Sequence, residues 1–169
     1  MTIKVINNSN NSLPQYETDK AAGLDVRADF SKITPETPIK LYGDGEVIFG
    51  NEIIKTKILR LDPGSRVLIP TGLCVAIPEG YEIQVRPRSG QALKKGITVL
   101  NTPGCIDSDY RGEIGVILIN QGLESVWIED GERIAQLILN KIERIEWYVV
   151  DTLDKTSRDS NGFGTTGVK

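Results

Sequence analysis

Two aspartates in a short polar run are the residues of this sequence best suited to acid–base chemistry. Asp107 and Asp109 lie within Ile106–Gly112, and on an extended chain residues two apart point to the same face. Such a pair can bind a metal, activate a water molecule or cap a turn. The sequence contains no histidine, which removes the commonest general base and the commonest zinc ligand. If the chain is an enzyme, a carboxylate is expected to move the proton, because Cys105 has no histidine to activate it.

A second cluster has the chemistry of a phosphate site. Arg88, Ser89 and Gly90 place a guanidinium, a hydroxyl and a glycine amide at the start of a predicted helix. Unpaired N–H groups at such a position favour an anion. The alternative is an ordinary helix cap followed by an exposed arginine.

The tail carries a third cluster. Gly162–Gly167 formally satisfies the Gly-x-Gly-x-x-Gly pattern of dinucleotide-binding proteins, but that pattern also needs a βαβ unit around it, which this sequence does not offer. Glycine amides, two threonine hydroxyls and Arg158 can instead wrap a phosphate chain as a flap, while Phe163 offers its ring to a base. A disordered tail is the alternative.

The elements that must position these clusters are mostly short β-type runs separated by Gly, Pro and Asp, a spacing that predicts an all-β sandwich or barrel. Tight turns are expected at Asp62-Pro63-Gly64 and Pro78-Glu79-Gly80. The predicted strands are Arg66–Pro70, Leu73–Ile77, Tyr81–Arg86, Ile114–Asn120, Val126–Ile128 and Ile134–Leu139.

One helix is expected, at Ser89–Lys95, with Ser89 as N-cap and Gly96 as terminator. Residues 33–57 are expected to form a surface excursion or extra hairpin, with Pro- and Gly-containing turn signals before the β-like run Ile53–Ile58. The predicted organisation is a single β domain over residues 1–153 and a mobile arm over residues 154–169.

Composition narrows the class of protein. With 169 residues, 25% charged residues and a net charge of −3, the chain suits one globular domain and lacks the basic excess of a nucleic-acid binder. No apolar run reaches membrane-span length and no signal peptide is evident, so a cytoplasmic location is expected. Cys74 and Cys105, the two cysteines, are expected to be buried, reduced thiols.

Taken together, five motifs in order resemble the trimeric dUTPase family, and the resemblance covers nearly the whole chain outside residues 33–57. It implies a distorted β jelly roll or β-barrel-like fold with one short helix. It also implies a homotrimer with active sites shared between subunits, a C-terminal arm that closes over the nucleotide, and Mg²⁺-dependent hydrolysis of dUTP to dUMP and pyrophosphate. The matching motifs are Ala22–Asp25, Pro87–Gly90, Gly104–Gly112, Gly131–Gln136 and Gly162–Gly167.

The resemblance also implies roles for individual residues. Asp107 matches the general base that activates water for attack on the α-phosphorus. Asp25 matches a carboxylate that supports Mg²⁺ through water, the metal being held mainly by the substrate's phosphates. The implied phosphate contacts are Arg88, Ser89, Gly90 and Gln136 from the β domain and Arg158, Gly164, Thr165 and Thr166 from the arm.

For the base and sugar, the resemblance implies a hairpin whose main chain reads uracil. Tyr110 matches the aromatic residue under deoxyribose, and Phe163 would stack on uracil. Backbone donors and acceptors would discriminate against cytosine by ~10⁴–10⁵. The implied uracil contacts are Asn101, Cys105, Ile106 and Gly115.

Some positions depart from the family pattern. Gln91 stands where an apolar residue is common, Lys95 where histidine is common, and Arg158–Gly162 has fewer glycines than many members. A dCTP deaminase shares the fold but tends toward Asp-Pro-Gly-Phe where this sequence has Asp107-Ser108-Asp109-Tyr110. The other alternative is a regulatory protein on the same scaffold that uses residues 33–57 as its partner surface.

Overall fold

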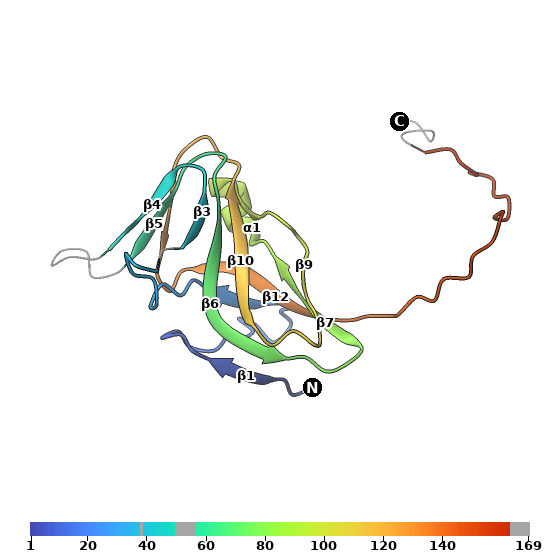
Figure 1. Cartoon of the computed structure of the whole chain (residues 1–169), viewed down its shortest axis with the longest axis horizontal. Helices are drawn as coiled ribbons and strands as arrows, with labels where there is room; N and C mark the ends of the chain where they lie inside the picture. The colour runs from blue at the N-terminus through green and yellow to red at the C-terminus, as the bar shows by residue number, and fades with distance from the viewer. Residues whose placement is uncertain (38, 50–56, 163–169) are drawn as a thin grey trace.

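The described chain, residues 1–37, 39–49 and 57–162 of a computed structural model, folds into antiparallel sheets with one short helix (Figure 1). This confirms the all-β, barrel-like class expected from the spacing of the β runs. The five-stranded sheet has the order β1-β6-β10-β8, with β3 also paired to β6. Its strands are β1 (Lys4–Asn7), β3 (Lys40–Tyr42), β6 (Arg66–Ala76), β8 (Ile97–Val99) and β10 (Glu113–Asn120).

The core lies where the sheets face one another, and side-chain alternation fills it. Along β10, Ile114, Val116 and Leu118 are buried while the residues between them are only half-buried, as the period of two requires. Burial of one such aliphatic side chain stabilises the fold by about 1.5–3 kcal/mol. The core residues come from strands that are far apart in sequence, so the core forms only when distant segments pack together.

A four-stranded sheet carries most of the polar clusters. Its order is β2-β12-β7-β9, and every neighbouring pair is antiparallel. Its strands are β2 (Leu24–Arg27), β7 (Tyr81–Arg86), β9 (Gly104–Ile106) and β12 (Arg133–Lys141).

The expected excursion is built into two sheets. β3 extends the five-stranded sheet, while β4 (Gly45–Ile48) pairs with β5 (Ile58–Leu61), which pairs with β11 (Val126–Glu129). Most of the β-like run Ile53–Ile58 lies outside the described residues, and its last residue, Ile58, is the first residue of β5.

The helix α1 (Ser89–Lys95) has the predicted bounds, and Gly96 ends it in the left-handed conformation at φ 70°. The predicted cap is wrong. Arg88 is the N-cap, with extended backbone and no side-chain cap bond, and Ser89 is the first helical residue. Arg88 still has the extended backbone of the chain leaving β7, and the first helical residue is Ser89, so the cap lies one residue earlier than the cap preference of Ser89 suggested.

The predicted strands Arg66–Pro70 and Leu73–Ile77 are one strand, β6. Gly72 lies inside it at φ +70°, and its partner β10 shifts register between Glu113 and Gly115. A glycine at a bulge lets the strand bend without ending. Both predicted turns are present, with Gly64 at φ 76° and Gly80 at φ 81°.

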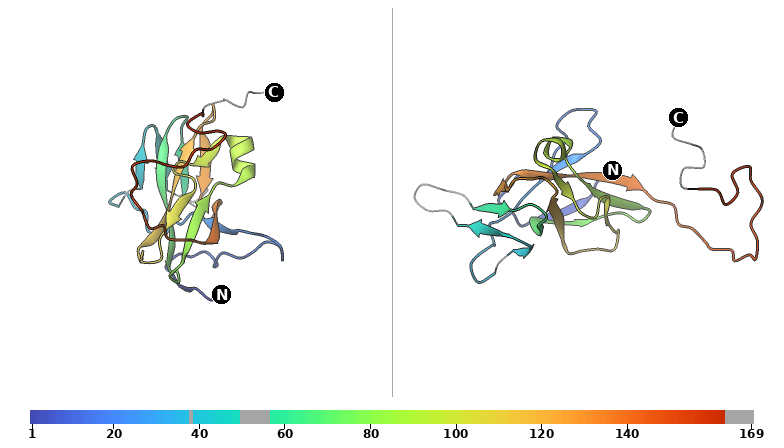
Figure 2. Two further views of the ribbon diagram at one scale, coloured as in Figure 1. Left: turned by 90° about the vertical axis from the view of Figure 1, so that its right-hand side faces the viewer. Right: turned by 90° about the horizontal axis from the view of Figure 1, so that it is seen from above.

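After β12 ends at Lys141 the chain continues away from the sheets, and Figures 1 and 2 show residues 142–162 reaching well outside the β core. This segment exposes Trp147, Tyr148 and Val149 at 85–90%. Within the described ranges, no helix is long and apolar enough to cross a membrane.

Candidate active site

A buried carboxylate lies at the centre of the first polar cluster. Asp25 is 7% exposed. Its Oδ2 pairs with Arg88 Nη2 at 3.2 Å and with Arg133 Nη1 at 3.1 Å, and its Oδ1 accepts a hydrogen bond from Gln136 Nε2 at 3.2 Å. Burying a carboxylate is costly unless it is paired and hydrogen-bonded. Two guanidinium groups and one amide satisfy that requirement here.

Strand register creates this cluster. Gln136 lies opposite Asp25 on β2 and opposite Arg86 on β7. Residues directly opposite in a sheet share a face, and Arg88, two residues beyond Arg86, remains close enough to reach Asp25. Arg133 was not among the residues singled out from the sequence; only the pairing of β2 with β12 brings it to Asp25.

A pocket of about 290 Å³ opens beside this cluster at α1. Its lining carries three cationic side chains, Arg88, Lys94 and Lys95, against one carboxylate, Glu132. Such an imbalance attracts anions. Ser89, Gly90 and Gln136 also line the pocket, so the structure places every phosphate contact expected from the β domain in one location.

A second pocket, of about 260 Å³, surrounds the candidate base. Asp107 is exposed and begins a turn in which Tyr110 N donates to Asp107 O at 3.2 Å. Tyr110 Oη donates to Glu113 O at 3.0 Å, which orients the ring. A Cβ on Gly112 would overlap that ring. Because glycine has no side chain, it makes room for Tyr110 at this position. Cys105, Ile106 and Gly115 line the same pocket.

Asn101 lies beside this pocket rather than in its lining. Its amide is close to Gly104, where an added Cβ would come within 3.1 Å of Asn101 Nδ2. Gly104 is buried and opens β9. The Asn101 side chain therefore packs against the hairpin that leads to Asp107.

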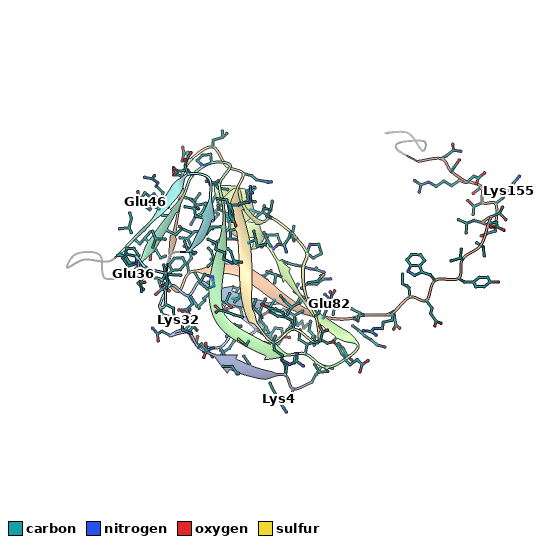
Figure 3. The ribbon with its side chains drawn as sticks, viewed as in Figure 1. Lys4, Lys32, Glu36, Glu46, Glu82 and Lys155 are labelled. Carbon is teal, nitrogen blue, oxygen red and sulfur yellow. The ribbon has the colours of Figure 1, made fainter. Side chains whose placement is uncertain are left out.

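The two pockets lie at opposite ends of the β7–β9 pair. Val85 pairs with Gly104 and Ile83 with Ile106, so Arg88 follows one end of the pair and Asp107 follows the other. At ~3.3 Å per residue the register separates them by roughly 20 Å. Figure 3 shows Glu82, the neighbour of Ile83, far from the position of α1 in the same view. One copy of the chain does not bring Asp107 to the cationic pocket.

The metal-binding potential of the described residues is limited. They contain no group of three or more His, Cys, Asp or Glu side chains that could hold an ion. Both oxygens of Asp25 already accept bonds from three donors. A cation in direct contact with Asp25 would have to compete with these donors, whereas a hydrated cation could meet Asp25 through water.

Known proteins similar to this chain identify its family. The dUTPase family model matches residues 49–167. The deoxyuridine 5'-triphosphate nucleotidohydrolase of Fusobacterium nucleatum is 51% identical over 165 residues, covering 98% of this chain and 96% of that protein. The corresponding protein of Finegoldia magna is 45% identical, covering 99% of each chain. The chain belongs to the dUTPase family.

Solved dUTPase structures agree with the fold. The enzyme of Staphylococcus bacteriophage 80alpha, solved with dUpNHpp, superposes with a TM-score of 0.75 at 25% identity and covers 99% of each chain. A mutant dUTPase of phage phi11 of S. aureus, in which a structural Mg(II) ion is coordinated, has a TM-score of 0.69 at 20% identity, covering 92% of this chain and 100% of that one. The second likeness supports the fold alone.

The arm of this dUTPase is described only in part. Arg158 is exposed, and its Nε donates to Asn161 O at 2.9 Å within the tail itself. The predicted contacts Phe163, Gly164, Thr165 and Thr166 lie outside the described residues.

Both cysteines are free thiols, as expected, but the prediction that both are buried is wrong. Cys105 is exposed and Cys74 is half-buried, because each side chain points to the outer face of its strand. A hydrogen bond with the Glu82 carboxylate raises the pKa of the Cys105 thiol, and slight desolvation and the negative charges of Glu82 and Asp107 raise it further. Cys105 is therefore held as a neutral thiol, unsuited to act as a nucleophile.

Proposed function

We propose that this dUTPase hydrolyses dUTP to dUMP and pyrophosphate, with Asp107 as general base and with each active site shared between copies of the chain. The observation that carries the proposal is the division of the site. An exposed carboxylate lies in a pocket sized for a nucleoside, and the cationic pocket suited to a triphosphate lies at the far end of the same strand pair. Removal of dUTP would keep uracil out of DNA, and the product dUMP would be available for thymidylate synthesis.

The nucleoside would bind in the pocket of Asp107. Backbone groups of Cys105, Ile106 and Gly115, together with Asn101, would read uracil, and the Tyr110 ring would pack under deoxyribose without room for a 2′-hydroxyl. The phage 80alpha dUTPase binds dUpNHpp, which supports a deoxyuridine nucleotide as the ligand. A polar site of this kind rejects the wrong base because its donors and acceptors would remain unpaired.

The reaction would proceed by in-line displacement. Asp107 takes a proton from a water molecule while the water oxygen forms a bond to the α-phosphorus. The bond from that phosphorus to the bridging oxygen breaks, and pyrophosphate leaves with the electron pair. General-base assistance contributes ~10²–10⁴-fold, and the neutralisation of phosphate charge supplies much of the remainder.

The phosphates would lie against α1 of a neighbouring copy. Arg88, Ser89, Gly90 and Gln136 would contact the α- and β-phosphates. Asp25 holds the Arg88 and Gln136 side chains in place, and it would face hydrated Mg²⁺ through water. The magnesium supplies charge neutralisation on the triphosphate and on the leaving pyrophosphate.

The arm would complete the site. Arg158, Gly164, Thr165 and Thr166 would contact the γ-phosphate, and Phe163 would stack on uracil. Closure of such a segment excludes water from the reacting groups. Residues 154–162 lie at the end of a segment that extends away from the β core of its own chain (Figure 1).

A trimer provides the neighbouring surfaces that this arrangement needs. β1 is an edge strand exposed along its length, and an apolar groove of about 280 Å³ beside it is lined by Ile3, Val5 and Leu139, among others. Trp147 and Tyr148 expose apolar surface in the tail. Exposed patches of this kind favour association with another copy.

Mixing two inactive variants tests the shared site. Trimers of Asp107→Asn alone and of Arg88→Ala alone are expected to be inactive. When equal amounts of the two are unfolded and refolded together, random assembly should restore about a quarter of wild-type turnover. A shared site is intact only when one copy keeps Asp107 and its neighbour keeps Arg88, which chance gives in about one site in four. The measurement is pyrophosphate release. Activity that stays at background in verified mixed trimers would show that both residues act within one copy.

Gly90 tests the phosphate position, because a Cβ added there meets nothing within 4 Å. Gly90→Ala should therefore raise helix stability by up to about 1 kcal/mol. It should also lower kcat/KM for dUTP roughly tenfold or more, because the methyl group occupies the space that a phosphate approaches. Thermal unfolding at fixed protein concentration and steady-state kinetics measure the two effects. A more stable variant with full activity would argue against phosphate contact at Gly90.

The function as a whole is tested by substrate range. Pyrophosphate release should be fast with dUTP and Mg²⁺ and should be negligible with dCTP, UTP and dTTP. Ammonia release from dCTP would instead identify a deaminase. Equal rates with dUTP and UTP would contradict the placement of Tyr110 under deoxyribose.

A further inference from the structure

Gln91 is the only buried residue of α1 in the described structure, 9% exposed. The neighbouring Leu93 is 87% exposed, so the helix has no apolar face against the core. A seven-residue helix is too short to be stable by itself. A polar contact, rather than hydrophobic packing, therefore holds it in place.

That contact is a pair of hydrogen bonds from the Gln91 carboxamide to Glu132 and Arg133, called the clamp below. Gln91 Nε2 donates to Glu132 Oε1 at 3.1 Å and to Arg133 O at 3.0 Å. Arg133 is the first residue of β12, the strand that also carries Gln136, and Glu132 immediately precedes it. The Gln91 amide nitrogen therefore donates to one carboxylate and to one backbone carbonyl.

Glu132 connects this clamp to its surroundings. Its Oε1 also pairs with Lys95 Nζ at 3.3 Å, and its Oε2 accepts a bond from Glu129 N at 3.2 Å. Gln91 and Lys95 are four residues apart, so they lie on one face of α1. The two positions of α1 that depart from the family pattern therefore contact the same carboxylate.

The clamp is joined directly to the phosphate-binding segment. Arg88 Nη1 donates at 3.2 Å to the same Arg133 carbonyl that Gln91 uses. Gln91 also follows Ser89 and Gly90 immediately in the chain, and it lines their pocket. Moving the Gln91 side chain would move the guanidinium, the hydroxyl and the glycine amide together.

We propose that Gln91 is a positioning residue for the triphosphate, fixing Arg88–Gly90 through Glu132 and Arg133. The proposal rests on the assignment of this pocket to the phosphates of dUTP. Gln91 Nε2 makes two hydrogen bonds, while Gln91 Oε1 is buried without a hydrogen-bond partner in the described structure. An unpaired buried polar atom is costly, so we assign to this amide a role in the geometry of the site rather than in stability. An apolar residue of similar size would fill the same volume but would not hold Arg88–Gly90 in a fixed position against the start of β12.

The test is Gln91→Leu, with Gln121→Leu as the matched control. Gln121 is exposed, and the hydrogen bond from its N to Gly96 O involves only the backbone. Gln91→Leu should weaken binding of dUpNHpp and lower kcat/KM for dUTP by about tenfold. Inhibition by deoxyuridine, which has no phosphate, should remain within about twofold of wild type. Gln121→Leu should match wild type in all three measurements.

Two variants at Glu132 test the same proposal if Gln91→Leu does not fold. Glu132→Ala removes the acceptor and should reproduce the selective loss of dUpNHpp affinity. Glu132→Gln keeps an acceptor oxygen and should lose less. Wild-type affinity for dUpNHpp in folded Gln91→Leu would overturn the proposal, as would equal losses for dUpNHpp and deoxyuridine. A wild-type protein inactive on dUTP would instead overturn the proposed function.

Discussion

Asp107→Asn should reduce the turnover of dUTP by about 10²–10⁴-fold, the usual contribution of a general base. The amide cannot accept the proton that water must lose. Asp107 is exposed and lines the nucleoside pocket, so the substitution leaves the core and the other contacts unchanged. Affinity for dUpNHpp should therefore remain within a few-fold of wild type, a pattern that separates chemistry from binding.

The neighbouring carboxylate provides the control for this prediction. Asp109 lies two residues away in the same turn, and Asp109→Asn removes the same charge while leaving the proposed base. It should retain most of the wild-type kcat in assays of pyrophosphate release. Comparable turnover by Asp107→Asn and the wild-type enzyme would exclude Asp107 as the base.

Removal of residues 158–169 should abolish turnover while leaving the fold and the proposed trimer intact. The truncation deletes Arg158 and the proposed arm contacts Phe163–Thr166, which would bind the γ-phosphate, stack on uracil and exclude water. Losing one well-placed electrostatic contact costs about 10²–10³ in kcat, and the arm supplies several. Sedimentation and far-UV circular dichroism should match the full-length chain, because Arg158 hydrogen-bonds within the tail rather than to the β core.

A shorter truncation controls for the loss of chain length. Removing Val168 and Lys169 leaves Gly162–Gly167 complete and should preserve activity. If the longer truncation dissociates the trimer, residues 158–169 act in assembly rather than as a flap. If it keeps wild-type turnover, the arm has no part in catalysis.

Local sequence signals predicted the elements whose geometry depends on neighbouring residues. Ser89–Lys95 is a helix with the predicted bounds because its composition and the terminating Gly96 act within the segment itself. The two Pro-Gly turns are present for the same reason. Local signals were insufficient at Gly72, which looks like a strand break in sequence. In the structure its positive φ is accommodated by a bulge against β10.

The candidate site shows the same division. The residue types suggested acid–base and phosphate chemistry, and the ordered motifs indicated the family. Nothing in sequence indicated that Arg133 would pair with Asp25, 108 positions away, or that Gln91 would be buried against Glu132. Those contacts depend on the register of β2, β12 and β7.

The sequence by itself determined which chemistry is available: carboxylates without histidine, a guanidinium beside a hydroxyl and glycine, and the family to which they belong. Only the tertiary structure decided where these groups lie. It surrounds Asp25 with three donors and uses a polar clamp to hold α1. It also separates Asp107 from Arg88 within one copy. The physical reason is that strand pairing between distant segments is selected by the burial of whole sheets, a sum over the entire chain that no local pattern contains.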